Sequence, residues 1–179
     1  MDALLAEARR RADKQYPGGM ADDDDVAGLR AMLTRNAGNV GEILKRPGRS
    51  GTNQTLYMLM AAAFTTAVRM RFGTDATPAT RPEVAQYIAD VRGRTARAKV
   101  ALGFDWTAAE RLILEVLEDG DEDEDDIGGK TRFAVYVAFT MVIVHDERLD
   151  ELGIEAFMLL SRERADKWLA PDAMTVRFG

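Results

Sequence analysis

The stretch from Thr131 to His145, TRFAVYVAFTMVIVH, constrains the fold more than any other part of the chain. Between Phe133 and Val144 its only polar side chain is Thr140. The stretch is too long for a typical strand and too short for a bilayer span, which needs about 20 apolar residues. It therefore predicts a buried core helix, although its valine and isoleucine content would also suit a strand. A charged cluster, His145 to Arg148, ends it.

A second apolar stretch, from Leu56 to Met70, is rich in alanine and methionine. Two helices of this kind cannot both face water, so they are expected to pack on each other, with the remaining helices laid over them. The chain is 179 residues long, which suits one domain. The sequence therefore predicts an all-α, single-domain bundle of about seven helices around buried helices at 56–70 and 133–144, with residues 1–19 as a possible N-terminal arm.

Local signals place the other helices. The acidic run at 22–25 precedes a helical pattern and suits the positive end of a helix dipole. The spacings Thr80–Glu83 and Thr107–Glu110 both predict capping boxes at helix starts. The helix after Thr80 carries an apolar stripe of Val84, Tyr87, Ile88 and Val91.

Composition excludes several chemistries. The chain has no cysteine, which rules out disulfides, thiolate metal sites and cysteine nucleophiles. Its single histidine, His145, follows the apolar helix and is expected to be a helix-end cation or a satisfied, partly buried ring rather than a catalytic base. No serine–histidine pair and no Glu-x-x-His pair is visible. We therefore expect no catalytic residue, no metal site, no cofactor and no enzymatic activity.

The acidic run EDGDEDEDD, residues 118–126, invites a calcium interpretation because its aspartates alternate. The EF-hand template fails when Asp121 is taken as the first ligand, because Asp126 then stands where glycine is needed and Arg132 where glutamate is needed. A register that begins at Asp119 fails in the same way. Residues 119–129 are therefore predicted to form a mobile, acidic loop without specific calcium binding.

The net charge of −6 is divided unevenly along the chain. Residues 35–99 carry 11 basic and 4 acidic side chains, whereas residues 100–179 carry 8 basic and 19 acidic ones. Such a division can mark an anion-binding half. Alternatively, the two halves attract each other within one chain or between subunits.

Two basic segments could bind anions. The segment Lys45–Thr55 combines cations, glycines and a helix start, which are the components of a phosphate site, but it lacks the P-loop pattern. The second segment, Arg92–Lys99, contains no acid and could contact a nucleic-acid backbone. The candidate anion-binding residues are Lys45, Arg46, Arg49, Thr52, Asn53, Arg92, Arg94 and Arg97. The alternative for the first segment is a solvated loop with an ordinary helix N-cap. The alternative for the second segment is that its positive charges attract the acidic C-terminal half of the chain.

The last helix has a wide apolar surface, which suits neighbours on two sides. Phe157, Met158 and Trp168 are the candidate interface residues, because aromatic and methionine side chains are enriched at interface cores. The sequence thus favours a non-enzymatic interaction or regulatory module that forms a homodimer or binds another protein. The alternative is a regulator that binds nucleic acid or phosphate through its basic middle. With no signal peptide and no membrane span expected, the cytoplasm is the default location.

Overall fold

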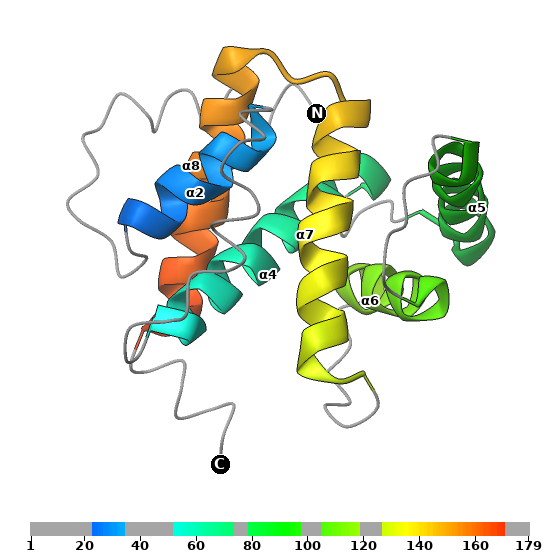
Figure 1. Ribbon diagram of the computed structural model, residues 1–179, viewed down its shortest axis with the longest axis horizontal. Coiled ribbons are helices and arrows are strands. Elements are labelled where there is room, and N and C mark those ends of the chain that lie inside the picture. Colours follow the sequence, from blue (N-terminus) through cyan, green and yellow to red (C-terminus); the bar gives the residue numbers. More distant parts are fainter. Residues whose placement is uncertain (1–22, 35–51, 74–78, 98–104, 119–126, 171–179) are drawn as a thin grey trace. The chain divides into compact units, whose positions relative to one another are not determined.

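The computed structural model describes residues 23–34, 52–73, 79–97, 105–118 and 127–170, apart from the side chains of Thr52 and Asn53. Within these ranges the chain forms six α-helices and no β-strand (Figure 1). The helices are α2 (Asp23–Leu33), α4 (Thr52–Phe72), α5 (Arg81–Arg97), α6 (Trp106–Glu118), α7 (Gly129–Asp146) and α8 (Glu151–Leu169). The prediction of an all-α fold is confirmed.

Helix α7 contains the whole of the apolar stretch predicted to be a helix, and the strand alternative is excluded. Val135, Phe139 and Ile143 follow one another at helical spacing and have no exposed surface. On the opposite side, Ala134, Ala138 and other apolar side chains are only half-buried. Helix α7 is therefore buried over more than half of its circumference and less deeply on the remaining side.

Helix α4 confirms the second predicted helix, at 56–70. Its buried residues include Leu59, Ala63 and Phe64, all at 1% exposure or less. The helix stops at Gly73, whose φ of 96° is a conformation that glycine adopts without steric cost. The N–H of Gly73 donates to the carbonyl of Arg69 at 3.1 Å, which closes the last turn. Contact between α4 and α7 stays a prediction.

The chain divides into two compact units. Unit 1 consists of residues 1–66 and 148–179, and unit 2 consists of residues 67–147. Helix α4 contributes to both, because the division falls between Thr66 and Ala67. The single domain and the N-terminal arm at 1–19 stay predictions, since most of what would test them lies outside the described residues.

In unit 1, α2 packs along α8. Leu29 and Met32 provide the buried side of α2. The first turn of α2 is acidic, as the run at 22–25 predicted. Helix α8 begins after Asp150, whose Oδ1 accepts a hydrogen bond from the N–H of Gly153 at 2.7 Å, so that the first turn is capped by a side chain.

In unit 2, α5 packs along α6 and α6 packs along α7. Val84 and Val91 of α5 and Ile113 of α6 are almost without exposed surface. The rings of Trp106 and Phe139 meet edge to face, with centroids 6.3 Å apart, and thereby join α6 to α7. The predicted apolar stripe of α5 is therefore the side that forms the core of this unit.

The two predicted capping boxes have different outcomes. At α5, the N–H of Thr80 donates to Glu83 Oε2 at 2.7 Å, which confirms the box and lowers the pKa of Glu83. Helix α6 begins two residues earlier than a cap at Thr107 predicts, at Trp106. There the Asp105 side chain accepts from the N–H of Thr107 at 2.9 Å, so Asp105 caps the helix. Aspartate competes well with threonine for this position, and the sequence spacing alone did not separate them.

The predicted acidic loop at 119–129 is described only at its end. Ile127 is buried and α7 already begins at Gly129, so these last residues belong to the packed entry of α7. The carbonyl of Ile127 accepts a hydrogen bond from Arg132 Nε at 3.2 Å, and Arg132 also pairs with Glu115 of α6. Residues 119–126 lie outside the described residues, so their mobility and their lack of specific calcium binding stay predictions.

Candidate functional site

A group of charged side chains from three helices lies at the C-terminal end of α7. Asp146 is the last residue of α7 and Glu147 is its C-cap. Negative charge is unfavourable at this end of a helix, because the carbonyl groups there already carry partial negative charge. Both carboxylates are drawn largely out of solvent, with 16% of the Asp146 side chain and 8% of the Glu147 side chain exposed. These two acids therefore need neutralising partners from elsewhere.

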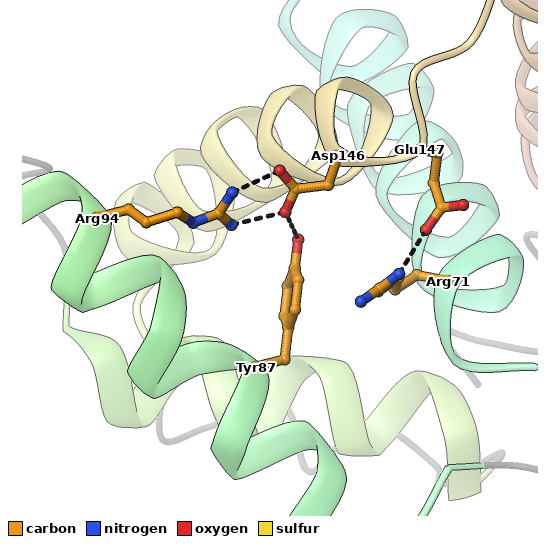
Figure 2. Close-up of polar contacts among 5 residues, drawn as sticks. All are labelled: Arg71, Tyr87, Arg94, Asp146 and Glu147. Atoms are coloured by element: carbon orange, nitrogen blue, oxygen red, sulfur yellow. Dashed lines mark hydrogen bonds and ion pairs between the residues drawn. The ribbon is translucent and has the colours of Figure 1, made fainter.

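Asp146 receives its partners from α5. Arg94 Nη1 and Nη2 donate to Asp146 Oδ1 and Oδ2, each at 2.6 Å, in the two-point geometry that suits a guanidinium and a carboxylate. The hydroxyl of Tyr87 donates to Oδ2 at 2.9 Å. Tyr87 and Arg94 are seven residues apart, or about two helical turns, so both reach the same carboxylate from one helix. Figure 2 shows the Tyr87 ring directed toward this carboxylate.

Glu147 receives its partner from α4. Arg71 Nη1 donates to Glu147 Oε1 at 3.0 Å (Figure 2). The Arg71 guanidinium also lies 5.1 Å from the centroid of the Tyr87 ring, within the range of a cation–π contact. The Tyr87 ring also packs edge to face against the Phe72 ring, with the two ring centroids 5.3 Å apart. We call Arg71, Tyr87, Arg94, Asp146 and Glu147 the Asp146 cluster.

The contacts of the cluster shift three pKa values. Hydrogen bonds from Arg94 lower the pKa of Asp146, against an opposing effect of burial, and the Tyr87 hydroxyl adds to the lowering. Burial raises the pKa of Tyr87, and the neighbouring Asp146 charge raises it further. The hydrogen bond to Asp146 raises the pKa of Arg94. Near neutral pH the cluster thus holds an ionised carboxylate, a neutral phenol and a charged guanidinium.

This arrangement is suited to holding helices together. Both oxygens of Asp146, the Tyr87 hydroxyl and the Arg94 guanidinium are engaged with one another, and Glu147 Oε1 is engaged with Arg71. His145, the neighbouring residue, is exposed, and its charge also favours ionised Asp146. The hydrogen bonds connect the ends of α4, α5 and α7. The Asp146 cluster therefore links α4, α5 and the C-terminal end of α7 through charged side chains.

The structure separates the candidate anion-binding residues. The guanidinium of Arg94 is engaged by Asp146 of its own chain rather than free for an external anion. Arg92 and Arg97, on the same helix, are exposed. Neither forms an ion pair with another residue in the described ranges. Lys45, Arg46 and Arg49 lie outside the described residues, and so do the side chains of Thr52 and Asn53, although both of these residues belong to α4.

The candidate interface residues have different environments. Phe157 is 1% exposed and Met158 is 5% exposed, so both are already packed inside the chain. Trp168 is half-buried and has contacts within the chain. Aromatic and methionine side chains fill cores as readily as interfaces, and their presence alone does not distinguish the two. An interaction surface on α8 would have to use side chains other than Phe157 and Met158, and an interface role for Trp168 stays a prediction.

Sequence reasoning did not predict that the members of the Asp146 cluster come together. It singled out only Arg94 among them as a candidate binding residue. It placed Tyr87 in a buried stripe and the acids in a charged helix end, without joining them. One signal was available: two consecutive acids at the end of an apolar helix contradict the usual preference for cations there. Such a local conflict predicts a compensating partner, although it does not identify Arg71 or Arg94.

Comparison with protein-family models, curated proteins and solved structures found no match. Among the described helices, none combines the length and the hydropathy that a membrane span requires. Within the same described ranges, histidine, aspartate and glutamate side chains form no group of three that could hold a metal ion.

Proposed function

We propose that this protein is a non-enzymatic helical interaction module that self-associates through the outer side of α8. The observation that supports this is the exposure of Leu152, which leaves 60% of its surface open to solvent at the first turn of α8. A leucine of this exposure is unusual for this chain, where no other large hydrophobic side chain in the described ranges is exposed. A single exposed leucine can be incidental, so its neighbours matter.

Leu159 and Leu160 continue the apolar side that Leu152 begins. They follow Leu152 by seven and eight residues, a spacing that places all three on one side of a helix. Both are half-buried, so part of each leucine remains available. We call Leu152, Leu159 and Leu160 the leucine patch. An apolar patch on the same helix of a second copy would be self-complementary about a two-fold axis, which is the commonest symmetry of soluble dimers.

Sedimentation velocity over a range of protein concentrations tests this proposal. Wild-type protein is expected to show a monomer–dimer equilibrium that persists at about 1 M salt, where the Debye length is about 3 Å, because apolar contacts are not screened. Leu152→Glu is expected to shift the equilibrium to monomer. Ala89→Glu, at an exposed alanine of α5, is the matched control and should leave the dimer intact. A wild-type monomer at every concentration contradicts the proposal.

A second candidate function is binding of nucleic acid or phosphate by the basic middle of the chain. The observation that favours it is the exposure of Arg92 and Arg97 on α5, without an ion-pair partner among the described residues. Gel-shift titration at several salt concentrations tests it. If the arginines contact phosphates, the affinity falls with salt, and Arg92→Gln with Arg97→Gln reduces the slope by about 2, one phosphate contact for each arginine. Binding that the double variant leaves unchanged excludes this role for the two arginines.

A further inference from the structure

The segment from Asp146 to Arg148 combines three features that are unfavourable by themselves. Asp146 and Glu147 place two negative charges at the negative end of the α7 dipole. Arg148, the next residue, has a φ of 49°, in the left-handed region where helix-terminating glycines usually occur. A side chain with a β-carbon is strained in that region. The two acids are held in place by contacts from other parts of the structure.

The contacts that hold this segment come from other helices. The hydrogen bonds to Asp146 come from Tyr87 and Arg94 of α5, and the ion pair of Glu147 comes from Arg71 of α4. The last turn of α7 supplies only the exposed His145 as a nearby cation. The backbone contributes one closing bond, from the N–H of Glu147 to the carbonyl of Ile143 at 2.9 Å.

From this we infer that the Asp146 cluster is a latch, in which helix α5 and the last turn of α7 open and close together. When α5 withdraws, Asp146 loses its arginine and its tyrosine and becomes an uncompensated acid at the wrong helix end. When the last turn of α7 frays, Arg94 and the buried Tyr87 hydroxyl lose their acceptor. Each half is thus less stable without the other, which is the condition for a cooperative local opening.

The latch controls an apolar surface. The side of α5 that faces the core of unit 2 carries Val84, Ile88 and Val91, which are at most 6% exposed in the closed form. Opening of α5 would uncover these side chains together with the Phe72 ring that packs against Tyr87. The device therefore links the charges at the end of α7 to the exposure of apolar residues on another helix. It does not depend on the leucine patch, which belongs to α8.

Native-state hydrogen exchange, read by mass spectrometry on the full chain, tests the latch. Arg94→Met is expected to speed exchange in peptides that cover 143–147 and in peptides that cover α5, both by about tenfold or more, since a hydrogen bond to a charged group contributes at least that factor. The matched control is Arg92→Met, on the same helix, which should change neither. Arg92 is exposed and forms no side-chain hydrogen bond within the described residues.

A second variant keeps the test decisive if Arg94→Met disturbs the whole unit. Tyr87→Phe retains the ring and its packing on Phe72 and removes only the hydroxyl that donates to Asp146. It should speed exchange in the same two regions by several-fold, and leave α2 unchanged. Faster exchange in α5 with an unchanged α7 end, in either variant, overturns the latch, as does an equal response to Arg92→Met.

Discussion

Both units of this protein use arginine–carboxylate pairs between helices, and one pair from each unit shows how much the surrounding water can differ. In unit 1, Arg30 of α2 pairs with Glu155 of α8, and the two side chains are 50% and 42% exposed. In unit 2, the Asp146 side chain that Arg94 holds is 16% exposed. Both side chains of the Arg30–Glu155 pair are therefore in contact with solvent, whereas in the Arg94–Asp146 pair the carboxylate is largely shielded from solvent.

The difference determines what each pair contributes. An exposed pair gains little Coulomb energy in water and loses side-chain entropy, so its net contribution is about 0–1 kcal/mol. A carboxylate withdrawn from water depends on its partner, because removing that partner leaves a charge that has been desolvated without compensation. Ion pairs of the same chemical type are therefore expected to be dispensable where both partners are exposed, as in Arg30–Glu155, and necessary where the acid is withdrawn from water, as in Arg94–Asp146.

The largest expected effect is that of Asp146→Asn. We expect it to lower the free energy of unfolding of unit 2 by about 1–2 kcal/mol, less than for a fully buried pair, because the Arg94 side chain is 44% exposed. Glu155→Gln in unit 1 should change stability by less than about 0.5 kcal/mol. The chain has two tryptophans, Trp106 in unit 2 and Trp168 in unit 1, so urea titrations of Trp168→Phe and Trp106→Phe backgrounds report on each unit separately.

The same comparison predicts a pH dependence. The folded-state pKa of Asp146 is lowered, so its contribution to stability is complete above the ordinary aspartate value of about 3.9 and is lost as the pH falls below it through the folded value. Wild-type unit 2 should therefore lose stability more steeply in this acidic range than Asp146→Asn. Urea titrations at a series of pH values measure the two slopes. Parallel slopes in wild type and variant would contradict the assignment.

Two buried hydroxyls extend the comparison between the units. Ser161, in α8 of unit 1, donates to the carbonyl of Phe157 at 2.8 Å. Thr140, in α7 of unit 2, is also without exposed surface, but its Oγ1 has no hydrogen-bond partner among the residues that the structure describes. Thr140→Val keeps the shape and removes an unsatisfied polar group, so it should stabilise unit 2 by about 1 kcal/mol.

Ser161→Ala is the matched control for that prediction. It loses a satisfied hydrogen bond and gains helix propensity, and these effects should offset each other to within about 0.5 kcal/mol. Thermal unfolding followed by circular dichroism compares the two variants. A destabilised Thr140→Val would show that the Thr140 hydroxyl has a partner in solution.

The smallest expected effect is that of Arg148→Gly, which relieves the left-handed conformation after α7. We expect a gain of about 0.5–1 kcal/mol, since the steric cost of the β-carbon is partly offset by the greater freedom of glycine in the unfolded chain. Arg148→Ala removes the same charged side chain but keeps the β-carbon, and should show no such gain. The midpoints of urea unfolding for the two variants give the comparison directly.

Much of the fold could be predicted from the sequence, because hydrophobic periodicity and helix-end signals act locally. The apolar stretches gave α4 and α7, Gly73 ended α4, and the Thr80–Glu83 spacing marked the start of α5. The degree of burial was harder to predict, since an apolar helix such as α7 can be buried more deeply on one side than on the other. Phe157 and Met158 were assigned to an interface for the same reason: composition does not tell which neighbour covers a side chain.

The Asp146 cluster could not be assembled from the sequence, because its members are brought together by tertiary structure. Arg94 and Asp146 are 52 residues apart, and Arg71 and Glu147 are 76 apart. Many arginines in this chain could have paired with these acids. What the sequence contained was the conflict itself, two acids at a helix end that favours cations, and the structure identifies the residues that resolve it.

A pair of double-mutant cycles tests the central claim, that burial makes the Arg94–Asp146 pair strong and exposure makes the Arg30–Glu155 pair weak. One cycle combines Arg94→Met with Asp146→Asn, and the other combines Arg30→Met with Glu155→Gln, each followed by the tryptophan of its own unit. The account predicts a coupling of about 1.5 kcal/mol or more in the first cycle and less than about 0.5 kcal/mol in the second. It also predicts that Asp146→Asn, which destabilises the wild type, stabilises the Arg94→Met variant, because the acid then keeps the Tyr87 hydroxyl but has no arginine to offset its repulsion by the helix dipole. Equal coupling energies in the two cycles, or a destabilising Asp146→Asn in both backgrounds, would contradict it.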